Sequence, residues 1–220
     1  MWKTSPTELS RSYHRLADRF PGRFVLGVGV GHAEQVGEMY ERPYESLMRY
    51  LDVLDGCGVP ASDRVIAALG DRMLRVSAER SLGAHTYLVP SKHTLHARHL
   101  VGIDAEIAPC TKVVFGDSIE VATEEAAKAI ADPYLGLVNY RNSLLRLGYS
   151  GEEIQHPRSI VADLVAMPTP GAVVARANEH GAAGASHVSL QLVGSAARHL
   201  TESLGLLADA FVTRRLFREP

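Results

Sequence analysis

The sequence contains only two cysteines among its 220 residues, Cys57 and Cys110, and they do not form a C-x-x-C pair. So few cysteines exclude a disulfide framework and are typical of a reducing compartment. No run of 18 apolar residues is present, and residues 1–6 lack the apolar segment of a signal peptide. We therefore expect a soluble, cytoplasmic protein that has no membrane span.

Charge of one sign is not in excess either, because 23 Lys and Arg residues stand against 25 Asp and Glu residues, for a formal net charge of −2. Nucleic acids select a basic surface, so this balance predicts no nucleic-acid partner. The short basic tail at Arg214, Arg215 and Arg218 does not change that expectation. With 46% hydrophobic residues the chain can form one sizeable core, which predicts a single domain over residues 1–220.

Several catalytic signatures are also missing. No G-x-G-x-x-G motif leads directly into a helix, which argues against a dinucleotide-binding Rossmann domain. Neither a Ser/His/Asp constellation nor a pair of catalytic carboxylates can be read from the sequence. Glu124 and Glu125 follow a predicted helix start at Thr123, where the helix dipole favours acidic residues.

What the sequence does contain is a regular alternation of apolar strands and amphipathic helices. Strands are predicted at residues 23–31, 64–69, 84–89, 111–115 and 187–193, and residues 32–42 are predicted as a long loop. Helices are predicted at residues 5–20, 43–54, 71–82, from 90, 123–131, 132–147, from 150, 158–166, 169–182 and 195–217. The alternation predicts βαβ units and a parallel sheet. Five strands are too few for a closed eight-stranded barrel, which typically takes about 250 residues.

Several helix ends are well marked. Ser5-Pro-Thr-Glu8 is a capping box with proline at the first helical position, and Ser150-Gly-Glu-Glu153 starts a short helix. Thr169 precedes Pro170 at another helix start. Asp71 is expected to cap its helix and Gly83 to terminate it.

Residues 23–32 carry three alternating glycines, Gly27, Gly29 and Gly31, after an apolar start that suits a strand buried on both faces. Glycine at every second position removes side chains from one face of a strand, so a flat ring or a phosphate can lie against bare backbone. Tight packing of a barrel strand explains the same spacing. His32 follows the last glycine, where it either serves a cofactor by a hydrogen bond or proton transfer or is a loop histidine without a role.

The segment Val89-Pro-Ser-Lys-His-Thr94 is a second candidate site, because a predicted strand ends and a helix begins there. Free backbone N–H groups of the first helical turn, the hydroxyls of Ser91 and Thr94 and the charge of Lys92 together suit an anion. Plain N-capping by Ser91 is the alternative.

The histidines that follow, His93, His96 and His99, do not predict a metal site. On a helix of 3.6 residues per turn the outer two diverge by about 120°. No acidic partner lies close to them in the sequence. We therefore expect no bound metal and interpret them as solvated histidines on a helix face.

Three stretches carry a family resemblance. The first joins residues 20–32 to Tyr40-Glu-Arg-Pro-Tyr44, and the second joins residues 64–74 to Ala78-Glu-Arg-Ser-Leu-Gly-Ala84. The third covers residues 173–193, with Glu179-His180 and Gly184-Ala-Ser-His-Val-Ser-Leu-Gln-Leu192. In order and spacing they resemble the luciferase-like oxidoreductases, in particular an actinobacterial branch thought to use the deazaflavin coenzyme F420. The resemblance covers nearly the whole chain and implies a (β/α)8 TIM barrel, with the cofactor at the carboxyl ends of the strands.

The resemblance also implies which residues bind the cofactor. Those that match the family's cradle after the glycine strand are Gly29, Val30, Gly31 and His32, and those that match its phosphate-binding junction are Val89, Ser91, Lys92, His93 and Thr94. The implied chemistry is hydride transfer between the reduced deazaflavin and an organic substrate, with His32 as the candidate catalytic residue. An FMN-dependent monooxygenase of the same fold is the alternative, because both cofactors offer a tricyclic ring and a phosphate.

The sequence departs from the family at its amino terminus. The family has three βα units before the glycine strand, whereas only Met1-Trp2 and the helix from Ser5 precede it here. The expected fold is therefore an incomplete barrel that lacks its first two to three strands. Asp71 also replaces the usual proline, and Met167-Pro168 replaces the usual Trp-Gly.

Three explanations of the short amino terminus stay open at this point. They are a misplaced start codon, a barrel that a partner or a homodimer completes, and a truncated remnant that binds without catalysis. An enzyme would take a small-molecule substrate, whose identity the sequence does not indicate.

Overall fold

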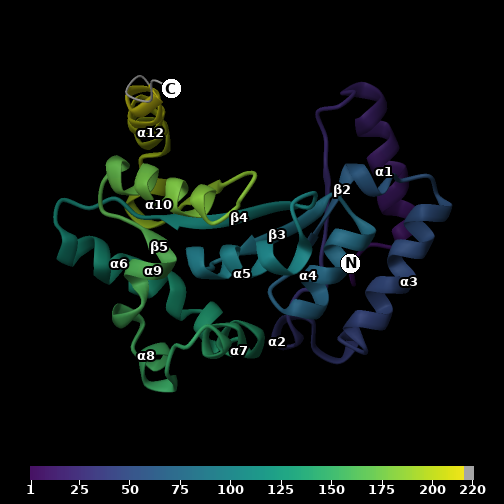
Figure 1. Cartoon of the computed structure of the whole chain (residues 1–220), viewed down its shortest axis with the longest axis horizontal. Helices are drawn as coiled ribbons and strands as arrows, with labels where there is room; N and C mark the ends of the chain where they lie inside the picture. Colours follow the sequence, from purple (N-terminus) through teal and green to yellow (C-terminus); the bar gives the residue numbers. More distant parts are fainter. Residues whose placement is uncertain (216–220) are drawn as a thin grey trace. The chain divides into compact units, whose positions relative to one another are not determined.

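The computed structural model describes residues 1–215, in which helices and strands alternate along the chain (Figure 1). The chain divides into two compact units: the first contains residues 1–86 and 99–108, and the second contains residues 87–98 and the chain from Pro109 onward. The sheet has six strands in this part of the chain. β1 pairs with β2, β2 with β3, and β4 with both β5 and β6, in each case parallel. The predicted α/β fold with a parallel sheet is therefore confirmed.

The first unit packs helices against strands β1 and β2. Its elements are α1 (Pro6–Arg19), β1 (Leu26–Val28), α2 (Ala33–Val36), η1 (Gly37–Met39), α3 (Pro43–Gly56), η2 (Ala61–Asp63), β2 (Arg64–Ala67), α4 (Asp71–Arg80) and all but the last residue of β3 (Gly83–Tyr87). α1 and α3 lie side by side (Figure 1). Tyr13 from α1 and Leu51 from α3 share one buried cluster with Ile66 of β2, so the apolar stripes read from the sequence form this core.

β1 is shorter and less buried than its sequence predicts. Leu26 and Val28 are buried, but Gly27 between them is exposed and Val25 is 48% exposed. The prediction of a strand buried on both faces is therefore wrong, because only one face of β1 is covered. The predicted loop at residues 32–42 is also partly helical, since α2 and η1 lie within it.

Gly83 is needed for the sheet and does not terminate a helix. α4 ends at Arg80, and Gly83 is the first residue of β3. A Cβ at this position would lie 2.0 Å from the carbonyl oxygen of Glu106, the first residue of β4. Only glycine allows so close a backbone approach, which corrects the helix-end interpretation.

The second unit contains most of the helices that the structure describes. Its elements are most of α5 (Ser91–Val101) and β4 (Glu106–Val113), followed by α6 (Ile119–Ala131), η3 (Tyr134–Gly136), α7 (Val138–Arg146), α8 (Gly151–Gln155), η4 (Pro157–Ser159), α9 (Val161–Leu164), β5 (Val165–Ala166), α10 (Pro170–Ala182), β6 (Ser189–Leu192), α11 (Gly194–Arg198) and α12 (Leu200–Arg215). The two-residue strand β5 lies where a helix at 158–166 was predicted. The end of the predicted terminal helix, residues 216–217, lies outside the described residues.

The strands β5 and β6 both pair with the carboxyl half of β4, one on each of its two edges. Backbone hydrogen-bonding groups of successive strand residues point alternately to one edge and the other. The N–H of Leu88, just after β3, donates to Cys110 O at 3.1 Å, and the N–H of Val114 donates to the last residue of β5 at 3.1 Å. The oxygen of Val113 instead accepts from the residue after β6 at 3.0 Å. β6 therefore follows β4 as the next strand, as in a (β/α) barrel, and β5 continues the edge that β3 occupies.

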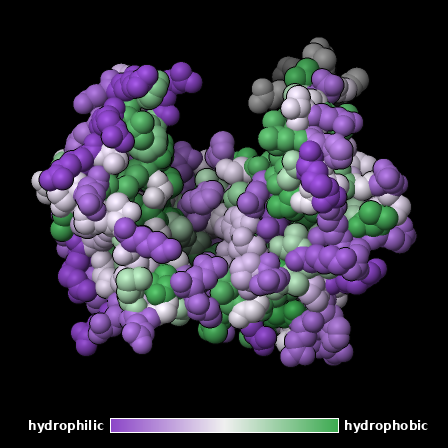
Figure 2. All heavy atoms as spheres, turned by 180° about the vertical axis from the view of Figure 1, so that it is seen from behind, coloured by the Kyte–Doolittle hydropathy of each residue, from purple (hydrophilic) through white to green (hydrophobic). Residues whose placement is uncertain are grey.

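The helix α12 packs against α10 on one side and exposes large apolar residues on its other sides. Ser203 and Leu207 are buried, and Leu207 joins Val173 of α10 in a small cluster. Figure 2 shows hydrophobic side chains gathered at the surface beside this end of the chain. Among the exposed large apolar residues of α12 are Leu200, Leu204, Leu206 and Val212.

Candidate functional site

The three glycines of the predicted cradle strand have three different environments. A Cβ on Gly29 would lie 2.9 Å from Ala67 Cβ, so close packing against β2 accounts for this glycine. Gly31 has a φ of +65°, a conformation that other residues rarely adopt. A Cβ on Gly27 would meet nothing within 4 Å. The bare backbone that a flat ring could lie against is therefore found at Gly27, two residues before the start of the predicted cradle.

The carbonyl groups of the predicted cradle already accept hydrogen bonds. The amino terminus of Met1 donates to Gly29 O at 3.1 Å, and Trp2 Nε1 donates to Val30 O at 2.5 Å. Burial lowers the pKa of that amino group. His32 precedes α2 as its N-cap residue and makes no side-chain cap bond. Residues 29–32 all belong to the first unit.

The predicted phosphate-binding junction belongs to the second unit and is only partly open. α5 begins at Ser91, as the sequence predicts. Val89 is buried, and His93 and Thr94 are 2% and 0% exposed, so these three side chains pack inside. Ser91 is half-buried and Lys92 is exposed, with Nζ 3.6 Å from the centroid of the Tyr149 ring. Of the five predicted residues, only Ser91 and Lys92 present side chains that a dissolved anion can reach.

Thr94 faces a buried histidine and not a ligand. Its Oγ1 lies 2.9 Å from His180 Nδ1, and Thr111 Oγ1 lies 3.4 Å from His180 Nε2. Burial, with the charges of Arg176 and His93, lowers the pKa of His180 to about 4. This neutral imidazole joins α5, β4 and α10 on the helix-covered face of the sheet.

The opposite face of the same strands carries a buried lysine that the sequence analysis did not select. Thr111 points to the helices, so its neighbour Lys112 points to the other face, as alternate residues of a strand do. Lys112 is 5% exposed, and its Nζ lies 4.8 Å from the ring centroid of Tyr134 and 5.8 Å from that of Tyr87. Its register partner on β6 is Gln191. The Tyr87 hydroxyl lies 2.5 Å from Gln191 Oε1 and 3.2 Å from the Tyr134 hydroxyl.

The burial of this lysine–tyrosine cluster changes its proton affinities. Burial lowers the pKa of Lys112, and burial is also the largest cause of the raised pKa of Tyr87. Burial also raises the pKa of the Cys110 thiol. A lysine inside the apolar run at 111–115 was the one sequence signal that could have identified this cluster, because charged residues are seldom placed in buried strands.

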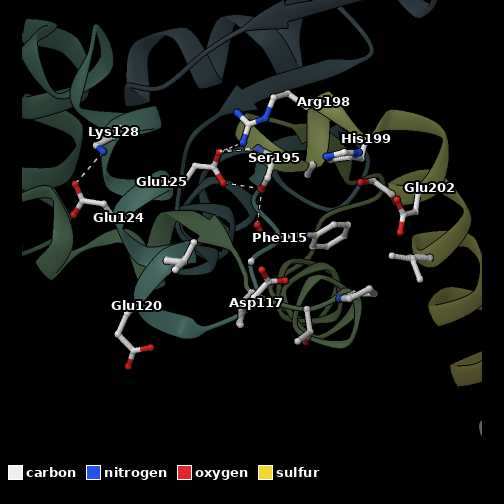
Figure 3. Close-up of a pocket in the computed structure, with 18 residues that line it drawn as sticks. Phe115, Asp117, Glu120, Glu124, Glu125, Lys128, Ser195, Arg198, His199 and Glu202 are labelled. Carbon is white, nitrogen blue, oxygen red and sulfur yellow. Dashed lines mark hydrogen bonds and ion pairs between the residues drawn. The ribbon is translucent and has the colours of Figure 1, made fainter.

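A cavity of about 1000 Å³ lies at the carboxyl ends of β4 and β6 (Figure 3). Within it the Glu125 carboxylate accepts hydrogen bonds from the Ser195 N–H at 2.7 Å, from the Ser195 hydroxyl at 2.7 Å and from Arg198 at 3.3 Å. Gly194 has a φ of +59°, and a Cβ there would lie 2.2 Å from Glu125 Oε1. The helix-dipole interpretation of Glu125 is wrong, because α6 begins at Ile119, well before it.

The charge of this cavity does not suit an anionic cofactor. Its lining contains the carboxylates of Asp117, Glu120, Glu124, Glu125 and Glu202, against the cationic groups of Lys128 and Arg198 and the imidazole of His199. Since Glu125 already occupies the amide of Ser195, a phosphate would meet a filled donor and surrounding negative charge. The junction at Ser91 and Lys92 is the better anion site of the second unit.

Neither a metal cluster nor a membrane helix is present within residues 1–215. No group of three or more His, Cys, Asp or Glu residues in this part of the chain is arranged to hold a metal ion. None of its helices combines the length and apolar composition that a membrane span requires.

Comparison with solved structures finds similar folds at low sequence identity. An F420-dependent secondary alcohol dehydrogenase in complex with an F420–acetone adduct is 12% identical, with a TM-score of 0.58 over 85% of this chain and 69% of that chain. Apo-MsnO8 is 14% identical, with a TM-score of 0.62 over 94% and 74%. The coenzyme F420-dependent tetrahydromethanopterin reductase from Methanopyrus kandleri is 14% identical, with a TM-score of 0.59 over 87% and 74%.

At the sequence level, no family model and no curated protein matches the chain. The structural matches each cover more than four fifths of it. Over most of its length the chain therefore has the fold of the luciferase-like F420-dependent oxidoreductases, the TIM-barrel type that the sequence resemblance implies.

Proposed function

We propose that the protein is an F420-dependent oxidoreductase of the luciferase-like class, from the actinobacterial branch that its sequence resembles. It transfers hydride between the reduced deazaflavin and a small organic substrate. The observation that carries this proposal is the fold shared with two F420-dependent enzymes, an alcohol dehydrogenase and a reductase.

The residues present fit the chemistry of the cofactor at both of its recognition groups. The open backbone at Gly27, beside the exposed side chain of Val25, suits a flat apolar ring. The half-buried Ser91 hydroxyl stands with the first-turn amides of α5 next to the exposed Lys92. Those donors suit a phosphate diester or monoester.

The protein's contribution is binding, orientation and proton handling. A deazaflavin, when bound, would supply the ring carbon that carries the transferred hydride. In the second unit, Ser91 and Lys92 bind the phosphate group. In the first unit, taken by itself, Gly27 leaves the face of its strand open to a flat ring. His32 holds or moves a proton on the substrate, since an imidazole ring can offer both a proton donor and a proton acceptor.

Fluorescence titration with F420, and separately with FMN, tests the proposal. We expect saturable binding of F420 at about micromolar concentration. The variant Gly27→Phe fills the open strand face without an internal clash and weakens binding by about tenfold or more, which corresponds to at least about 1.4 kcal/mol. Gly205→Phe, also exposed and with nothing within 4 Å of its Cβ, is the matched control and binds as the wild type does.

The phosphate end is tested by Lys92→Met, with the exposed Lys3→Met as its control. Loss of affinity only in the first variant supports the junction. If the protein binds FMN saturably and does not bind F420, the cofactor is a flavin and the F420 part of the proposal is wrong. A folded protein that binds neither contradicts the proposal and favours a non-catalytic remnant.

A further inference from the structure

Lys112 is a buried cation for which residues 1–215 supply no anion. It is 5% exposed, and its contacts are the ring faces of Tyr87 and Tyr134 and the electrostatic influence of the Cys110 thiol. No carboxylate of the described residues is among the causes of the shift in its pKa. Lysine is almost never fully buried unless it is paired, and two ring faces at these distances offset the burial only in part.

The tyrosine hydroxyls do not satisfy this amine. The Tyr87 hydroxyl lies within hydrogen-bond distance of Gln191 Oε1 and of the Tyr134 hydroxyl. Lys112 contacts both tyrosines through their ring faces, which attract a cation but are not conventional hydrogen-bond acceptors. The three N–H donors of Lys112 remain available to a molecule from solution.

The position of the cluster is that of a ligand site. Lys112 is the last residue but one of β4, Tyr87 is the last residue of β3, and Gln191 is the last but one of β6. All three lie at carboxyl strand ends, on the face away from the helices, which in a (β/α) barrel lines the interior. Gln191 is exposed and Tyr87 is half-buried, so a small molecule can approach this face from solvent.

We propose that Lys112, with Tyr87, Tyr134 and Gln191 around it, is a binding site for a planar monocarboxylate. This site goes beyond the proposed function and does not depend on F420. One ammonium group matches one negative charge, whereas a phosphate carries nearly two. The tyrosine rings favour a flat, partly apolar carrier of the carboxylate over a hydrated one.

Binding is expected to change the proton affinity of Lys112. The titratable groups that face Lys112 are Cys110 on its own strand, Tyr87 from β3 and Tyr134 from η3, and Tyr140 of α7 packs edge-on against Tyr134. Burial lowers the pKa of Lys112, and a carboxylate that pairs with its charged form opposes that shift.

Isothermal titration calorimetry with benzoate tests the site, with neutral benzamide as the matched probe. The titrations use the full chain without cofactor. We expect benzoate to bind saturably at about millimolar concentration or below, and benzamide not to bind. Lys112→Met is expected to weaken benzoate binding by about tenfold or more, whereas the exposed Lys128→Met leaves it unchanged.

Equal binding of benzoate and benzamide, equal binding by the wild type and Lys112→Met, or no saturation up to about 10 mM would each overturn the proposal. The comparison of the two probes needs only the wild-type chain, so it decides the matter even if Lys112→Met does not fold. Benzoate binding without F420 binding would reject the proposed function and support the site at Lys112. F420 binding without benzoate binding would support the proposed function and reject the site.

Discussion

His180 shows how the environment of one residue controls a measurable property. Both of its ring nitrogens lie beside threonine hydroxyls, and the side chain is fully buried. The protonated form would add a charge inside the second unit beside two threonine hydroxyls and near the positive charge of Arg176. The folded protein therefore keeps the imidazole neutral, with a pKa lowered to about 4 from its ordinary value of 6.5.

That lowered pKa predicts a loss of stability in acid. Between pH 6.5 and pH 4 the unfolded chain binds a proton at this histidine and the folded chain does not, so the free energy of unfolding falls as the pH falls. At about 1.4 kcal/mol for each pH unit, the loss reaches about 3 kcal/mol at pH 4. Urea unfolding of the wild type and of His180→Gln over this range measures the effect, because glutamine does not titrate.

The exposed His187→Gln is the control, and it should retain the wild-type pH profile. An identical pH dependence in the wild type and in His180→Gln would contradict the assignment of this loss to His180.

At the scale of elements, one ion-pair network joins α3, β2 and α4 in the first unit. Arg64 is 1% exposed, donates to Asp55 Oδ1 at 2.5 Å and donates from Nε to Arg80 O at 2.9 Å. Arg80 in turn contacts Asp55 at 2.8 Å and Asp52 at 2.8 Å. Burial raises the pKa of Asp55, but hydrogen bonds from the two arginines outweigh it and hold that pKa below its usual value.

Asp55→Asn is expected to lower the free energy of unfolding by about 2 kcal/mol, because it leaves the buried guanidinium of Arg64 without a carboxylate. The figure lies below the usual cost of breaking a buried pair, since Asp55 is half exposed and asparagine still accepts a hydrogen bond. Asp52→Asn breaks only a surface pair and should cost less than about 0.5 kcal/mol. Chemical denaturation of the two variants makes the comparison, and equal losses would show that the buried arginine does not need its partner.

At the scale of the whole molecule, the boundary between the two compact units does not follow a linker. It cuts β3 between Thr86 and Tyr87, α5 between Arg98 and His99, and β4 between Ala108 and Pro109. Boundaries of independently folding domains usually fall in exposed connecting segments. A boundary inside a helix and two strands indicates that neither unit is complete alone, which keeps the single domain over residues 1–220 as our proposal.

Differential scanning calorimetry should therefore record one unfolding transition, with equal calorimetric and van't Hoff enthalpies. Two resolved transitions would instead mean that the units unfold separately. Asp55→Asn, in the first unit, provides an internal check, because it should shift the single transition as a whole.

Much of the fold could be predicted from the sequence, but less of the candidate site. The capping boxes at Ser5 and Ser150 are present as predicted, and so is the cap at Thr169. Each depends on residues three apart, so the local sequence is sufficient. The junction at 89–94 was placed correctly at a helix start, yet burial removes His93 and Thr94 from any ligand.

The features that could not be predicted depend on residues far apart in the chain. Glu125 meets Ser195, Thr94 meets His180, and Gly83 lies against Glu106. None of these pairs has a local pattern that announces it. The two-residue strand β5 is similar, because only its pairing with β4 distinguishes it from the end of a helix.

By itself, then, the sequence determined the alternation of strands and helices, the helix starts and the small net charge of the chain. Periodicity and capping depend on residues that are close in the sequence, and net charge depends only on composition. Only the tertiary structure decided which face of β4 the helices cover, and so that Lys112 is buried among tyrosines on the other face. The reason is that strand pairing sets the facing of every side chain on a strand, and pairing is a long-range event.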